Sequence, residues 1–195
     1  NRPALGDSQS NVGKNLMTLA NTYNQAWLKN YETANGEYAN WNGLDQYNRN
    51  PYWDLYKNQN KSDKDVFRFT AKAIYNVDSH LKIQGTIGTD INDMNFQDYI
   101  ARTTPGKSAG QLQESVFKNR TLNAELLALY NNQFGDFDVN ATLGGNIFKV
   151  DNKTTIFTGL SEQMPGVIAI MNYQEQSVQQ NTYKKQINSI YGSAS

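Results

Sequence analysis

The 195 residues carry 18 basic and 18 acidic side chains, one histidine and no cysteine, so the formal net charge is zero at neutral pH. The absence of cysteine excludes disulfides, thiolate nucleophiles and zinc–thiolate sites. Basic residues form no run that would track a nucleic-acid backbone, so no nucleic-acid partner is expected. The single histidine, His80, lies in a predicted turn, and we expect no catalytic residue, no metal, no cofactor and no enzymatic activity.

Residues 1–65 show no strand-like alternation and contain all three tryptophans. Between residues 11 and 30 apolar side chains recur at helical spacing, and Ser10 is placed to cap the first turn. The pattern predicts an amphipathic helix over about 11–30. Lys14 and Lys29 are too few for a face that binds anionic lipid, so the apolar stripe is expected to pack on the rest of this region.

Aromatic side chains are dense between residues 31 and 60, among Asn and Gln amides. Rings stack on sugar C–H faces while amides pair with hydroxyls, which makes Trp41, Tyr47 and Trp53 candidate substrate-binding residues. The alternative is that these rings only fold the segment and its contact with a partner.

Four segments alternate side chains with a period of two, over residues 66–75, 81–91, 121–130 and 137–148. A tilted strand needs about 9 to 11 residues to cross a bilayer, whereas an average globular strand has about 5 to 6. The segments therefore have the length of membrane-spanning strands.

One row of each segment is uncharged, and the opposite row is polar or charged. The uncharged rows include Phe67 and Phe69, Ile83 and Ile87, Leu122 and Leu126, and Val139 and Leu143; the polar rows include Arg68 and Lys72, Lys82 and Asp90, Asn123 and Glu125, and Asp138 and Asn140. A lipid-facing Lys or Arg at the bilayer midplane costs about 2 to 4 kcal/mol, while the lumen of a barrel accepts charges. The partition predicts an all-β fold that is a segment of a large antiparallel transmembrane β-barrel.

The connections support this prediction. Residues 76–80 and 131–136 are short turns, whereas 92–120 and 149–181 are long and polar and are expected to be external loops. Residues 1–65 are then an extracellular loop region that contains the helix, and residues 66–195 hold the strands. A soluble antiparallel sandwich also alternates, and a soluble carbohydrate-binding β-domain stays as an alternative.

A fifth alternating segment begins at about residue 182 and continues to 195. The smallest membrane barrels have about eight strands, and an open sheet edge in lipid leaves unpaired backbone groups. We therefore expect the rest of the barrel to lie outside these 195 residues.

Several segments resemble the SusC/RagA family, the TonB-dependent outer-membrane transporters of Bacteroidetes. The resemblance is carried by Asn48-Arg49-Asn50-Pro51-Tyr52-Trp53-Asp54-Leu55, by the segments that begin at Leu81 and Asn119, and most specifically by Phe134-Gly135-Asp136-Phe137-Asp138-Val139-Asn140. It covers about residues 36–195 and does not extend to the helix predicted over 11–30.

The resemblance implies an internal piece of a 22-stranded barrel in the outer membrane of a Gram-negative bacterium. It implies as partners a SusD-like surface lipoprotein that closes over the substrate, the remainder of the same barrel with its plug, outer-membrane lipid, and the TonB complex through regions absent from these residues. The substrate is an oligosaccharide or a peptide, and the sequence does not choose between them. A structural or adhesive outer-membrane barrel is the second alternative.

Overall fold

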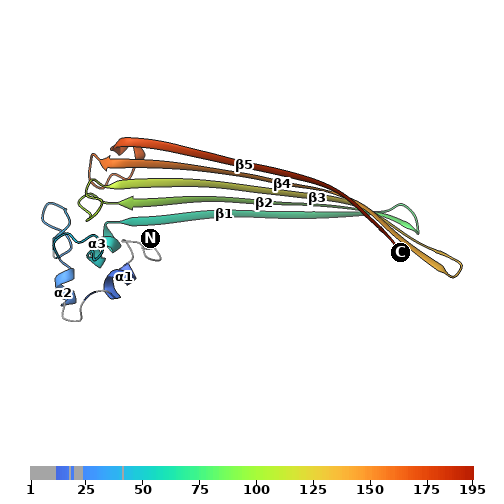
Figure 1. Cartoon of the computed structure of the whole chain (residues 1–195), viewed down its shortest axis with the longest axis horizontal. Helices are drawn as coiled ribbons and strands as arrows, with labels where there is room; N and C mark the ends of the chain where they lie inside the picture. Colours follow the sequence, from blue (N-terminus) through green and yellow to red (C-terminus); the bar gives the residue numbers. More distant parts are fainter. Residues whose placement is uncertain (1–11, 18, 20–23, 41) are drawn as a thin grey trace. The chain divides into compact units, whose positions relative to one another are not determined.

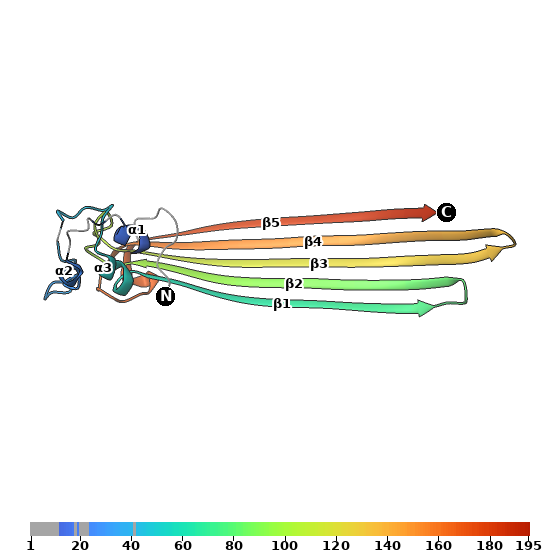
Figure 2. The same cartoon turned by 90° about the horizontal axis from the view of Figure 1, so that it is seen from below.

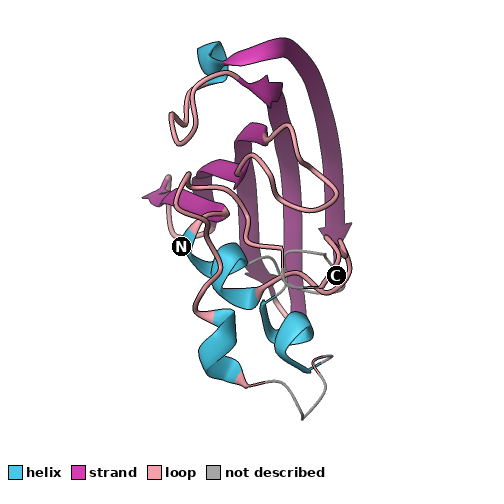
Figure 3. Cartoon of the chain, turned by 90° about the vertical axis from the view of Figure 1, so that its left-hand side faces the viewer, coloured by secondary structure: helices cyan, strands magenta, loops and turns pink. Residues whose placement is uncertain are grey.

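The computed structural model describes residues 12–17, 19, 24–40 and 42–195, and strands make up most of this part of the chain (Figures 1 and 3). In chain order the elements are α1 (Val12–Met17), α2 (Gln25–Leu28), α3 (Pro51–Tyr56), β1 (Gln59–Asn76), β2 (Leu81–Ile100), β3 (Gln111–Phe134), β4 (Phe137–Glu162), the 3-10 helix η1 (Ile170–Asn172) and β5 (Tyr173–Ala194). None of the helices in the described ranges is long and apolar enough to cross a bilayer.

The five strands form one open antiparallel sheet in the order β1-β2-β3-β4-β5, each beside its sequence neighbour (Figure 2). This confirms the antiparallel sheet that the strand pattern predicted. The chain divides into two units, of which the first holds residues 1–63, 95–116 and 155–180 and the second holds 64–94, 117–154 and 181–195.

In the second unit, backbone hydrogen bonds fix the strand register. The Asn131 N–H donates to the His80 carbonyl over 2.8 Å, and Asn140 and Ser195 exchange two hydrogen bonds of 2.9 Å. Gly135 has φ +64°, which suits glycine, and turns the chain between β3 and β4. Because side chains alternate along each paired strand, this register keeps the two predicted rows on opposite faces of the sheet.

The polar face of the second unit is joined by cross-strand pairs. Arg68 Nε lies 2.7 Å from Asp90 Oδ1, Asn146 donates to Asn123 over 2.7 Å, and the Tyr191 hydroxyl donates to Glu125. The other face, which we call the uncharged face, carries Phe67, Leu126 and Leu143, with exposed fractions of 57%, 61% and 63%. In the described chain these apolar side chains are exposed and do not fill a closed core.

Gly144 lets two side chains meet on the polar face. A Cβ at this position would lie 2.7 Å from Leu127 Cδ2 and would also collide with the Tyr191 ring. Leu127 and Leu129 are apolar residues on the polar row of β3, and the place of Leu127 over Gly144 beside Tyr191 accounts for the first of them. The glycine is thus required for close packing rather than for backbone conformation.

The strands are longer than the sequence predicted, and the two predicted external loops are correspondingly wrong in extent. Residues 92–100 and 111–120 belong to β2 and β3, and 149–162 and 173–181 belong to β4 and β5, which leaves connections of only 101–110 and 163–172. β1 likewise begins at Gln59 rather than at residue 66. The alternation of apolar and polar side chains ends where both faces of a strand meet polar surroundings. The backbone hydrogen bonds between strands do not depend on this alternation, so the strands continue beyond it.

The single helix predicted over 11–30 is also wrong within the described residues. α1 ends at Met17, Leu19 is a bend, and Asn24 has extended backbone angles and caps α2 by accepting from the Ala26 N–H over 2.9 Å. Asn favours such a cap over a helix interior because its side chain competes for backbone N–H groups. Residues 11, 18 and 20–23 lie outside the described residues.

The first unit has its own small core, built around Trp53. Its buried apolar members are Tyr38, Trp53, Tyr99, Ala101, Leu112 and Tyr173. They come from the segment before α3, from α3 itself, from the connection after β2, and from the ends of β2, β3 and β5. This core fixes α3 against the connection 101–110.

Candidate functional site

Helix α3 begins where the sequence provides both a cap and a first-turn proline. Asn50 Oδ1 accepts from the Tyr52 N–H over 3.0 Å, and Pro51 follows at the first helical position. Asn50 is fully buried, and its own N–H donates to the Tyr38 hydroxyl over 2.8 Å. This start directs Trp53 and Asp54 into the interior of the first unit.

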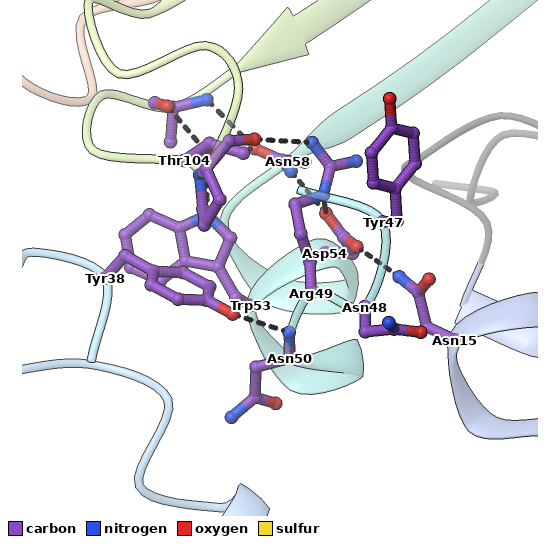
Figure 4. A network of polar contacts seen from close by, with 12 residues as sticks. Asn15, Tyr38, Tyr47, Asn48, Arg49, Asn50, Trp53, Asp54, Asn58 and Thr104 are labelled. Carbon is purple, nitrogen blue, oxygen red and sulfur yellow. Dashed lines mark hydrogen bonds and ion pairs between the residues drawn. The ribbon is translucent and has the colours of Figure 1, made fainter. Parts of the chain in front are cut away.

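Asp54 is the centre of a buried polar network (Figure 4). Its carboxylate lies 3.4 Å from Arg49 Nε and accepts from the amides of Asn58 over 2.6 Å and Asn15 over 2.8 Å. Arg49 and Asp54 are 1% and 3% exposed. Removing one partner of a buried pair typically costs about 3 to 5 kcal/mol, because the other charge stays buried.

The network continues to the connection 101–110. The Trp53 indole N–H donates to Thr104 Oγ1 over 2.8 Å, and the Thr104 hydroxyl donates to the Ala101 carbonyl over 2.6 Å. Asn58 Oδ1 accepts from the Ala101 N–H over 2.9 Å, and Arg49 reaches the Pro105 carbonyl. Helix α3 and this connection are therefore held together by hydrogen bonds to buried partners, which fixes the walls of the adjoining cavity.

Burial raises the pKa of the Asp54 carboxyl above its ordinary value, because desolvation disfavours the charged form. The Arg49 guanidinium and the hydrogen bond from Asn58 act in the opposite direction and are the smaller effects. By contrast, the pKa of the exposed Asp45 carboxyl is lowered, mainly because it accepts from the Tyr47 N–H. The pKa values of these two carboxyls therefore shift in opposite directions, because one carboxyl is buried and the other is exposed and accepts a backbone hydrogen bond.

A cavity of about 340 Å³ lies in the first unit beside this network. Its charged and polar lining consists mainly of Glu32, Glu37, Lys57, Tyr99, Arg102 and Glu162. Its volume is at the small end of the range of about 300 to 1,000 Å³ for ligand pockets. A mixed lining of this kind suits a ligand that carries charge.

Two acidic groups of the cavity wall have partners within the protein, although Glu162 Oε2 is buried without a hydrogen-bond partner. Lys57 forms an ion pair with Glu32. Glu162, which is 5% exposed, accepts from the Tyr99 hydroxyl over 3.0 Å and from the Gly166 N–H over 2.8 Å through the same Oε1 atom. In the described part of the chain Glu37 and Arg102 form no ion pair, and both residues are exposed. They are the exposed charged groups of the wall that form no ion pair, whereas the Glu162 carboxylate is buried.

The three predicted substrate-binding residues have different outcomes. Trp41 lies outside the described residues. Tyr47 is 58% exposed, in the segment that Asp45 organises. Trp53 is 1% exposed, with its indole N–H already bonded, so its ring faces are used by the core. The structure therefore gives Tyr47 and Trp53 different surroundings and does not join them in one site.

Other aromatic side chains of this region pack on one another. Tyr31 and Tyr56 have ring centroids 5.6 Å apart, Tyr52 and Tyr56 6.2 Å, and Tyr38 meets Trp53 edge-on at 5.3 Å. Such pairs contribute about 0.5 to 1.5 kcal/mol beyond area burial. These contacts are the ones expected if the rings fold the segment.

The sequence prediction missed Arg49, Asp54 and the cavity wall from β2 and β4. The Asn50-Pro51 pair is a helix-start signal, and it could have placed Trp53 and Asp54 one turn into a helix. No local signal marks Glu162 or Arg102, because the cavity joins them to Glu37 across long sequence separations. Over the residues that the structure describes, no group of three or more His, Cys, Asp or Glu could hold a metal ion.

No family model matches the sequence, and no curated protein matches it. Two solved structures are similar. One is a chain of the RagAB peptide importer in the "closed-closed" state, with 12% identity over 75% of this chain and a TM-score of 0.68. The other is a chain of the RagAB peptide transporter, with 10% identity over 83% of this chain and a TM-score of 0.70.

The chain has a SusC/RagA-like fold. It spans 17% and 19% of the length of those two chains, so the likeness is to a segment of each. At this level of identity the comparison shows the fold alone. The fold matches a segment of a large β-barrel, as the strand pattern predicted.

Proposed function

We propose that this chain is part of a TonB-dependent outer-membrane importer, in which it supplies barrel wall and external connections. The observation that carries the proposal is the uncharged face of β1 to β4, with Phe67, Leu126 and Leu143 more than half exposed, in a fold similar to the RagAB importer chains. A bilayer accepts such a face, and the opposite polar face lines a lumen. The role is binding and transport without catalysis.

The proposed partners follow from the same assignment. They are the remainder of the barrel with its plug, outer-membrane lipid, the TonB complex through other regions, and a SusD-like surface lipoprotein that closes over the substrate. The similar structures are of RagAB complexes, which supports a lipoprotein partner. A structural or adhesive barrel would present the same wall but would carry no substrate.

For the substrate we favour a peptide over a glycan. Among the described residues the cavity of the first unit has two carboxylates that form no ion pair, the exposed Glu37 and the buried Glu162, and one guanidinium that forms none, Arg102. A peptide offers the complementary ammonium and carboxylate groups, whereas a neutral oligosaccharide offers neither. The described solved structures are of a peptide importer, which supports the same choice.

Peptide binding to the intact protein tests this proposal. We expect Arg102→Gln and Glu37→Gln each to weaken the binding of short zwitterionic peptides about fivefold, the effect of losing an exposed ion pair of about 1 kcal/mol. Lys107→Gln is the matched control, because Lys107 lies on the same connection as Arg102 but outside this cavity. Isothermal titration calorimetry measures the affinities.

Three results would contradict the proposal. Equal affinities for all three variants would show that the cavity does not hold the peptide. Tight binding of a neutral oligosaccharide, with no binding of peptides, would favour the glycan alternative. Cells that retain the barrel in the outer membrane but take up neither substrate would favour the adhesive alternative.

A further inference from the structure

The uncharged face does not continue unchanged along the strands, because charged residues follow its apolar rows on the same side of the sheet. Arg120 is two residues from Leu122 on β3, and Lys149 is two residues from Ile147 on β4. Side chains two apart on a strand point to the same face. The charges therefore lie at the border of the apolar rows, about 7 Å further along each strand.

Cross-strand ion pairs show that neighbouring strands bring these charges together. Arg120 Nη2 lies 3.5 Å from Asp93 Oδ2, and Lys184 Nζ lies 3.3 Å from Asp151 Oδ2. Side chains on opposite faces of a sheet could not meet in this way. The complete group, which we call the basic belt, consists of Asp93, Lys118, Arg120, Lys149, Asp151, Lys153 and Lys184.

Within the described chain the basic belt has an excess of positive charge. It holds five cations against two carboxylates. Both carboxylates are already paired, and within the described chain Lys118, Lys149 and Lys153 form no ion pair and are exposed. Asp65 occupies the corresponding face of β1, so the positive charge belongs to β3, β4 and β5.

On β3 and β4 the opposite face at the same level carries no charge, whereas Lys185 on β5 and Lys64 on β1 lie on that opposite face. On β3 and β4 the alternate positions are uncharged and include Asn119, Phe148 and Val150. A strand that simply extended into water would have no reason to separate charges by face. On β3 and β4 this separation favours an anionic surface on the side of the basic belt.

We propose that the basic belt binds the phosphate groups of lipids in the outer leaflet of the membrane. This inference rests on the proposed membrane function, because it takes the apolar rows to be covered by acyl chains. A lipid on those rows places its headgroup at the height of Lys118, Lys149 and Lys153. Lysine stems lie along the apolar surface while the ammonium groups reach the phosphates.

The test uses the intact protein in a neutral detergent, titrated with bisphosphorylated lipid A and followed by thermal unfolding. The wild type gains thermal stability as the lipid binds. The triple variant K118Q/K149Q/K153Q needs a much higher lipid concentration for the same gain, about fivefold per cation removed. The control K72Q/K82Q, which removes cations from the polar face, titrates like the wild type.

The other possible outcomes of this experiment also support or overturn the proposed lipid binding. Dephosphorylated lipid A gives the wild type no more stabilisation than the triple variant receives. The proposal is overturned if the triple variant titrates like the wild type, or if the substitutions change only the self-association of the protein, which would make the belt a protein interface. Lys149→Gln alone gives a smaller loss in the same direction if the triple variant does not fold. Substrate uptake is measured separately, so its absence would refute the importer proposal without touching lipid binding.

Discussion

At the scale of single residues, the first unit depends on a carboxylate that is buried among amides and one guanidinium. Asp54 gains hydrogen bonds from Asn15 and Asn58 and the charge of Arg49, yet desolvation still raises the pKa of its carboxyl. Its role is to position α3 and the connection 101–110, which build the cavity wall. We therefore expect it to influence ligand binding only through the order of these segments.

The raised pKa of Asp54 gives a pH dependence whose sign can be worked out. Folding keeps the carboxyl protonated at pH values where the unfolded chain has lost the proton, so the local free energy of unfolding falls as pH rises above the ordinary value of 3.8. Asp54→Asn should abolish this fall. Hydrogen-exchange protection of the Lys57 and Ala101 amides, corrected for intrinsic exchange, measures it. An unchanged slope in the variant would assign the pH dependence to another group.

The residues of this network also show where sequence-based prediction ends. The cap at Asn50 and the proline at 51 are neighbours in sequence, and the helix start can be predicted from them. The contacts of Asp54 with Asn15 and of Trp53 with Thr104 join positions 39 and 51 residues apart. Such contacts depend on the folded core, so Trp53 was predicted as a ligand contact although it is a core residue.

At the scale of elements, the sequence predicted the parts of the strands in which one face carries apolar and the other polar side chains. It missed the parts of the strands that lack this alternation. The alternation of Ile83, Ile87 and Ile91 marks β2 reliably, but β2 continues by backbone hydrogen bonds to Ile100. The same holds for β4 beyond Ile147. Hydrophobic periodicity reports which surroundings a strand has, and only indirectly how long it is.

Close packing between strands gives a second prediction at this scale. Gly144→Leu should destabilise the sheet by about 1 to 3 kcal/mol, because the new side chain would displace Leu127 and Tyr191. Gly145→Leu is the matched control, since its Cβ would have only the Ser189 carbonyl oxygen within 4 Å, at 3.7 Å. Urea denaturation of the intact, membrane-inserted protein compares the two. Equal losses for both variants would show that the packing on Gly144 is not what sets the effect.

At the scale of the whole molecule, every functional proposal depends on which face of the sheet meets lipid. The two faces differ in charge over β1 to β4, and the fold matches segments of importer chains at 12% and 10% identity. A soluble carbohydrate-binding domain would instead bury the uncharged face in a dry interior. The two arrangements place the same residues in opposite surroundings.

Spin labels at single cysteines test this directly, because the 195 residues contain no native cysteine. In the intact protein in lipid bilayers, labels at Ile87, Leu126 and Leu143 should be relaxed strongly by oxygen and weakly by a water-soluble nickel chelate. Labels at Thr86, Asn123 and Asn140 should show the reverse preference. The account would be contradicted if neither reagent reached the labels at Ile87, Leu126 and Leu143 while the nickel chelate reached the other three labels.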